Sequence, residues 1–220
     1  MMNRTLVLIG CVLASLGLRA QERNRLPDVS ATVKGELTLP VPVGTPLFAS
    51  ITESIGQLGV VYQHPVYKGL GLGVGGGMSW FGLEERALAP IVTTGEVRRS
   101  RAFGKVAYER YTTARSFYEL SLRAGLSFYR FDCPTCEDEP AQAFHWGVGS
   151  AYYLHATENL AFGLTLGYEQ DMRRFAAGDL GLSSFPGRKE VEEAGSSGYL
   201  IVGLSFSTRL RASPDSDRGW

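Results

Sequence analysis

Eight stretches of this chain alternate apolar residues with small or polar ones, and this alternation limits the possible folds more than any other feature. The stretches cover residues 31–40, 55–64, 68–81, 101–112, 116–130, 143–154, 158–171 and 197–210. Successive side chains of a β-strand point to opposite faces, so a period of two indicates strands with two different faces. The sequence predicts an all-β protein of eight strands, and 27 glycines in 220 residues fit a turn-rich fold.

The connections between these stretches alternate in length along the chain. Long connections cover residues 41–54, 82–100, 131–142 and 172–196, and short ones cover 65–67, 113–115 and 155–157. Transmembrane barrels of bacterial outer membranes have short periplasmic turns and longer extracellular loops. The order therefore predicts an eight-stranded antiparallel up-and-down transmembrane β-barrel with both of its ends on the periplasmic side.

The small residues decide which face of each strand meets lipid. In the seventh stretch, one face carries Leu160, Phe162, Leu164, Leu166 and Tyr168, and the other carries Ala161, Gly163, Thr165, Gly167 and Glu169. A soluble eight-stranded barrel such as a lipocalin also alternates, with its apolar face inward. Glycine, alanine and serine make a poor aqueous surface but fit a crowded, narrow interior. We therefore expect the apolar face to point outward into lipid, with the soluble barrel as the alternative.

The first residues predict a secretory signal peptide. A largely apolar run of 13 residues at 6–18 is followed by Arg19-Ala20 and then by polar residues. The run is too short to span a bilayer core of about 30 Å as a helix, which disfavours an uncleaved anchor. Gly10-Cys11 has the form of a lipoprotein processing site, but the apolar run continues past it. The expected organisation is a signal peptide at 1–20, an N-terminal lead at 21–30, the barrel at 31–210 and a short tail at 211–220.

Charged residues with the parity of the small-residue face predict an ion-pair network in the lumen. They are Lys34, Glu36, Lys105, Glu109, Glu119, Arg123, Glu169 and Arg209, four basic and four acidic. Charges in a low-dielectric interior are tolerated when they are paired, so this balance favours a plugged lumen. The alternative is a path for protons or ions.

Two cysteines of the predicted mature chain, Cys133 and Cys136, are spaced as C-x-x-C in a predicted loop. A zinc site would need a second pair of Cys or His ligands nearby, and a thioredoxin-like centre would need a helix in an α/β fold. In the oxidising compartment that a signal peptide implies, the pair favours a local disulfide.

The three histidines do not form a recognisable catalytic group. His64 and His155 flank predicted periplasmic turns, and His145 has the parity of the lumen. His155, Thr157 and Glu158 offer a base, a hydroxyl and an acid, but closeness in sequence does not establish the geometry that catalysis needs. We expect no catalytic residue, no cofactor and no metal.

With this pattern of strands and connections, residues 31–210 resemble the small OmpA-like outer-membrane barrel superfamily. The segment Gly198–Phe206 is similar to the terminal strand that barrel-assembly machinery recognises, with alternating apolar residues and an aromatic at its end. The chain departs from that pattern because it continues through 211–220, and no peptidoglycan-binding domain follows. The resemblance implies the outer membrane of a Gram-negative bacterium.

Charge balance narrows the expected partners. With 22 basic and 22 acidic residues the chain lacks the basic excess that nucleic-acid binding needs. We expect a monomer in contact with outer-membrane lipid that has a structural or surface-interaction role through its loops, with an unknown surface partner or small molecule. The alternatives are a narrow channel or a transporter of small hydrophobic molecules, and then a lipid-modifying barrel enzyme.

Overall fold

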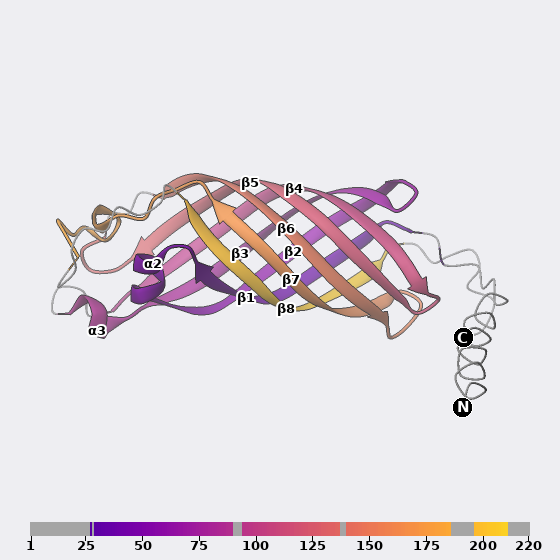
Figure 1. Cartoon of the computed structure of the whole chain (residues 1–220), viewed down its shortest axis with the longest axis horizontal. Helices are drawn as coiled ribbons and strands as arrows, with labels where there is room; N and C mark the ends of the chain where they lie inside the picture. Colours follow the sequence, from indigo (N-terminus) through magenta and orange to yellow (C-terminus); the bar gives the residue numbers. More distant parts are fainter. Residues whose placement is uncertain (1–26, 28, 90–93, 137–139, 186–195, 211–220) are drawn as a thin grey trace, which may run out of the picture.

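The computed structural model describes residues 27, 29–89, 94–136, 140–185 and 196–210. Within them eight antiparallel strands close into one barrel in chain order (Figure 1). The strands are β1 Thr32–Val43, β2 Thr52–Tyr67, β3 Leu70–Leu83, β4 Glu96–Thr113, β5 Ser116–Asp132, β6 Ala141–His155, β7 Leu160–Asp171 and β8 Ser197–Arg209. The predicted fold is confirmed. The predicted signal peptide and C-terminal tail lie outside the described residues.

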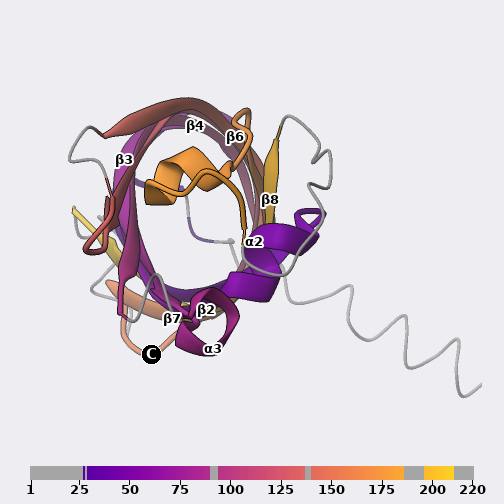
Figure 2. The ribbon, with the colours of Figure 1, turned by 90° about the vertical axis from the view of Figure 1, so that its left-hand side faces the viewer.

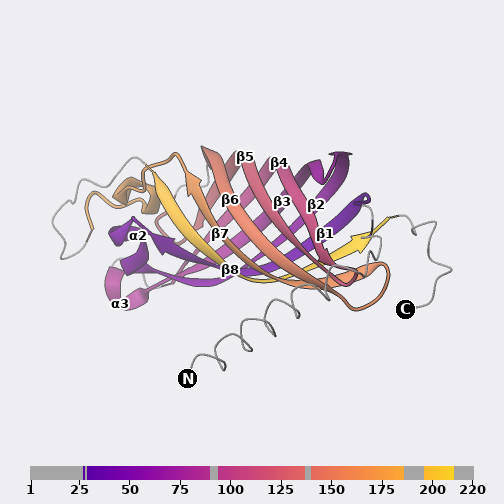
Figure 3. The ribbon, with the colours of Figure 1, turned by 45° about the vertical axis from the view of Figure 1, so that its right-hand side comes forward.

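Three short helical segments lie at one end of the barrel, which we call the loop end. They are α2 Pro46–Ile51, α3 Glu85–Leu88 and the 3-10 helix η1 Ala177–Leu180 (Figures 1 and 3). The opposite end, the turn end, carries the three short connections and the two ends of the barrel sequence. Viewed from the loop end, the η1 segment lies across the barrel mouth and α2 lies at its rim (Figure 2). None of the helices in the described residues has the length and apolar character needed to cross a membrane.

The strand register fixes the tilt and width of the barrel. A row of directly paired residues, followed once around the barrel, leaves β1 at Thr32 and returns to it at Pro42, ten residues later. Strand number and stagger together set the diameter, and eight strands leave an interior that side chains just fill.

β4 begins earlier than the sequence predicts. Residues 96–100 belong to the connection predicted at 82–100, yet they pair with both β3 and β5. Val97 and Arg99 point inward and are buried, whereas Arg98 points outward and is exposed. The alternation therefore continues through this segment, with charges in place of apolar residues.

The exterior of the barrel is an apolar belt. Leu164 is 69% exposed, and Leu72, Leu122, Phe162 and Leu204 are each more than half exposed. Residues with the inward parity are buried, including the charged Lys34 of β1 and Glu169 of β7. A soluble barrel would show the reverse. An apolar outer face with a polar interior is the arrangement of outer-membrane-type transmembrane barrels.

Candidate functional site

The barrel register brings the luminal charges together from distant parts of the chain. Lys105 pairs with Arg123, and the same row continues through Gly147 to Glu169. Directly paired residues of neighbouring strands point to the same face of the sheet, so the side chains of this row all point into the lumen. Glycine leaves room for the larger side chains: a Cβ on Gly147 would contact the Glu169 side chain.

Near the turn end, one lysine lies between two acids. Glu109 and Glu119 are directly opposite on β4 and β5, and Lys34 Nζ forms ion pairs with both carboxylates. Lys105 Nζ lies 2.6 Å from Glu119 Oε1, and Gln63 donates from Nε2 to Glu109 Oε1 at 2.9 Å. Like charges directly opposite on a sheet repel, so Lys34 makes this arrangement possible.

At mid-height, arginines bind the remaining glutamates. Arg123 Nη1 donates to Glu36 Oε2 at 2.8 Å and lies 3.9 Å from Glu169 Oε1. Arg101 also pairs with Glu169. The Arg123 guanidinium centre is 5.2 Å from the centroid of the Phe103 ring, so a cation–π contact adds to the ion pairs.

Toward the loop end, Asp171 is the centre of a denser group. Arg99 donates to its two oxygens from Nε at 2.7 Å and Nη2 at 2.8 Å, and from Nη1 to Glu169 Oε2 at 3.0 Å. His145 Nδ1 lies 2.8 Å from Asp171 Oδ1, and Tyr129 donates its hydroxyl hydrogen to Asp171. The two hydrogen bonds from Arg99 to Asp171 make a bidentate pair, which is the strong form of an arginine–carboxylate interaction.

Seven of the eight residues proposed for the lumen lie in these groups. Arg209 lies apart from them, near the turn end, where it donates to the Tyr111 hydroxyl and lies 3.5 Å from His155 Nε2. Arg99, Arg101 and Asp171 also belong to the network, although they were not among the predicted luminal charges. Their parity could have identified them, because residues two apart on a strand share a face. Positions 99 and 101 share the inward face of β4 with Lys105, and position 171 shares that of β7 with Glu169.

The charges of the buried network balance. Its cations are Lys34, Arg99, Arg101, Lys105 and Arg123, and its acids are Glu36, Glu109, Glu119, Glu169 and Asp171, all buried. Removing one partner of a buried pair leaves an uncompensated charge, which is strongly destabilising.

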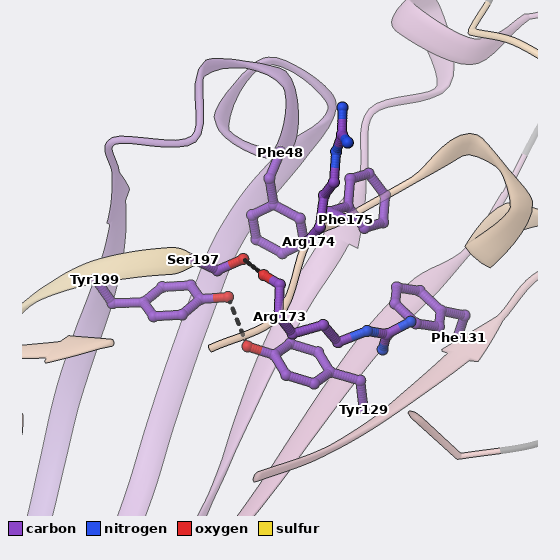
Figure 4. A pocket seen from close by; sticks show the side chains of 8 residues that line it. All are labelled: Phe48, Tyr129, Phe131, Arg173, Arg174, Phe175, Ser197 and Tyr199. Atoms are coloured by element: carbon purple, nitrogen blue, oxygen red, sulfur yellow. Dashed lines mark hydrogen bonds between the residues drawn. The ribbon is translucent and has the colours of Figure 1, made fainter. Parts of the chain in front are cut away.

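An apolar cluster, which we call the outer cap, covers the network at the loop end. Phe48 of α2 packs edge to face on Phe81 of β3, Phe175 and Tyr199 of β8, with ring centroids 5.4, 5.2 and 6.2 Å apart. Phe48, Phe175 and Tyr199 also line a small void of about 10 Å³ together with Tyr129 and Phe131. Figure 4 shows these five rings. Below them the hydroxyls of Tyr199 and Tyr129 lie 2.9 Å apart, so the cap is linked to the Asp171 group (Figure 4).

A second aromatic cluster, the inner cap, lies below the network at the turn end. Phe117 stacks on Tyr153 at 4.7 Å between ring centroids and lies 5.1 Å from Tyr111. Lys34 Nζ is 5.3 Å from the centroid of the Tyr153 ring, so the inner cap adjoins the charged network directly. Packed side chains therefore occupy the lumen at both ends and between them.

The remaining candidate residues lie near the ends of strands. Cys133 and Cys136 form a disulfide in the β5–β6 connection, and Thr135 Oγ1 donates to the Leu180 carbonyl at 2.7 Å. This bond holds the connection against the η1 segment. The Thr157 hydroxyl accepts a hydrogen bond from the Leu160 amide at 3.1 Å and so completes a turn. The described residues contain no group of three His, Cys, Asp or Glu side chains that could hold a metal.

No family model matches the sequence, and no curated protein matches it. Solved structures of small outer-membrane barrels do match. Neisserial surface protein A is 11% identical with a TM-score of 0.46, over 81% of this chain and 96% of that chain. Ail of Yersinia pestis is 10% identical with a TM-score of 0.44, over 82% and 99%. OprG from Pseudomonas aeruginosa is 9% identical with a TM-score of 0.42, over 84% and 98%.

The chain has the fold of the small eight-stranded outer-membrane barrels. The strand number, the closed antiparallel order and the short turns at one end carry that assignment. The resemblance predicted from sequence is thus confirmed for the fold, which many functions can share.

Proposed function

We propose that this chain is a non-enzymatic protein of the Gram-negative outer membrane that acts through its loop end, exposed at the cell surface, and not through a pore. The filled lumen carries the proposal. Five buried cations and five buried acids pair with one another between two aromatic caps. An ion crossing the barrel would have to displace both caps and break several buried pairs.

The loop end offers a better-formed surface than the pore. The β5–β6 connection is closed by its disulfide and held to the η1 segment, and α2 is anchored through Phe48. A rigid scaffold that positions loops is a common basis for binding. These loops are the expected contact site for a surface partner or small molecule.

Planar-bilayer recording of the purified protein tests this proposal. We expect no stable channels from the unmodified chain. The variant Phe48→Ala/Phe175→Ala, which removes two rings of the outer cap, should also remain silent because the charged network and the inner cap are intact. Large, stable channels of nanosiemens scale from the unmodified protein would contradict the filled lumen.

The geometry around His145 supports the absence of enzyme activity. Its ring is fully buried and its Nδ1 contacts Asp171, beside Arg99, so a lipid substrate could not reach it without displacing this group. Mass spectrometry of lipid A from cells with and without the gene tests this directly. We expect identical spectra, and a mass change that depends on His145 would show a lipid-modifying enzyme.

A further inference from the structure

Outward arginines of β4 mark the two edges of the apolar belt. Arg98 and Arg110 are exposed on the outer face, and none of the outward residues of β4 between them is charged. They are twelve residues apart, which is about 41 Å along a strand that rises about 3.4 Å per residue. In a strand tilted by about 35–45° they lie about 30 Å apart along the barrel axis, slightly more than the height of about 25 Å of the apolar band of such barrels. Arg98 and Arg110 therefore reach the headgroup layers on opposite sides of the membrane.

Acids balance the arginines at the loop end. Arg98 is directly opposite Arg130 on the outer face. Arg98 also forms ion pairs with Glu96 at 2.8 Å and with Asp132 at 3.4 Å. Two cations and two acids are thus together on this part of the wall, and no further anion is needed to compensate them.

At the turn end, two cations lie together without such acids. The Glu109 amide donates to the Gly69 carbonyl at 2.8 Å, so the β2–β3 turn lies against the end of β4. Lys68 precedes Gly69 in the turn, and Arg110 follows Glu109 in β4. Both cations are exposed, and no acid of the described residues forms an ion pair with either. Glu109 itself is buried in the lumen, where it pairs with Lys34.

Tyrosine rings surround these two cations on the outer face. Lys68 Nζ lies 5.2 Å from the centroid of the Tyr67 ring, which is 64% exposed. Tyr118 is directly opposite Arg110, and its ring centroid is 6.5 Å from that of Tyr108. Tyrosine is enriched at the membrane interface because its ring is apolar and its hydroxyl is polar. We call these five residues the turn-end patch, and its rings place both cations at the level of the lipid phosphates.

We propose that the turn-end patch binds the phosphate of an anionic phospholipid in the leaflet on the turn side of the membrane. The Arg110 guanidinium donates to two phosphate oxygens, and the Lys68 ammonium adds a second positive charge. The bound phosphate relieves the repulsion between the two cations. A zwitterionic headgroup brings an ammonium of its own, which both cations repel, whereas phosphatidylglycerol has none. The inference rests on the membrane location proposed above.

Native mass spectrometry of the full-length mature protein tests the turn-end patch. The protein is reconstituted in vesicles that contain equal amounts of phosphatidylcholine and phosphatidylglycerol and is then extracted in a mild detergent. The lipids that stay bound are counted, and we expect phosphatidylglycerol to be enriched several-fold over phosphatidylcholine. Equal retention of the two lipids, or retention of neither, would overturn the site. Protein that does not insert into the vesicles would instead overturn the membrane location.

Two double variants locate the bound lipid. Lys68→Asn/Arg110→Gln removes both cations of the turn-end patch, and asparagine tolerates the positive φ of Lys68. The enrichment should fall to near unity. Arg98→Gln/Arg130→Gln removes two cations at the loop end, whose charges acids already balance, and should leave the enrichment unchanged. Only protein that shifts on a gel after boiling is analysed, so unfolded protein does not contribute. Equal losses in the two variants would mean a general attraction between anionic lipid and arginine, and would contradict the site.

Discussion

Lys34 lies between two acids that would otherwise repel each other. Glu109 and Glu119 are directly opposite across β4 and β5, and Lys34 forms ion pairs with both. Replacing Lys34 by methionine keeps much of its volume and removes its charge. We expect Lys34→Met to lower the free energy of unfolding by about 3–5 kcal/mol, the usual cost of removing one partner of a buried pair. Urea unfolding in lipid vesicles, followed by gel mobility, measures it.

A second change separates charge from packing. Adding Glu109→Gln to Lys34→Met removes one acid, and Glu119 keeps Lys105 as its partner at 2.6 Å. The double variant should recover much of the lost stability. A double variant no more stable than Lys34→Met alone would mean that the packing of the lysine stem, not its charge, matters.

Phe206 covers a glycine on the outer face. Gly35 of β1 is directly opposite Phe206 of β8, and a Cβ at Gly35 would overlap the ring. We expect Gly35→Ala to cost no more than about 1 kcal/mol, below the usual range for overpacking a core, because the atoms it meets are the far end of the exposed Phe206 ring. The same change in a Phe206→Ala background should cost much less, because the ring is gone. Equal costs in the two backgrounds, measured by urea unfolding, would refute this contact.

Among the elements, the β2–β3 hairpin depends on its two turn residues. Lys68 and Gly69 both have positive φ, 39° and 87°, between the paired Tyr67 and Leu70. Such two-residue turns favour Asn-Gly. Gly69→Ala should destabilise the barrel by at least about 1 kcal/mol because an L side chain is strained there and its Cβ would overlap the Glu109 carbonyl oxygen. Lys68→Asn should leave stability equal or higher, and a loss with Lys68→Asn in urea unfolding would contradict the turn assignment.

The elements also show where the sequence was sufficient and where it was not. Alternation located all eight strands, because a period of two is a local property. It missed the start of β4, where Val97 and Arg99 keep the inward parity in a charged segment. The short α2 and the end of β1–β2 pairing at Thr38 could not be predicted. Both depend on the register between strands and on packing under the outer cap.

For the molecule as a whole, the small residues of the sequence predicted which face of each strand points into the lumen. The sequence did not predict which luminal charges form ion pairs with one another. Parity places a charge inside the barrel without saying which opposite charge it meets. The stagger of the strands decides that, and it brings Glu36 of β1 to Arg123 of β5. The same parity placed Arg209 with the network, although the register puts it near Tyr111 at the turn end.

The position of an outward residue along the barrel axis should set the cost of placing a charge on it. Leu164 lies in the middle of the belt and Leu210 follows the end of β8, and both are exposed. In lipid vesicles we expect Leu164→Arg to cost about 2–4 kcal/mol and Leu210→Arg about 0–1 kcal/mol, because the penalty for arginine falls from the bilayer midplane to the interface. In a water-soluble barrel both residues would face solvent, and arginine would cost little at either one. Equal and small losses in urea unfolding would therefore contradict the membrane-spanning arrangement, whereas a loss confined to Leu164 would follow from a belt immersed in lipid.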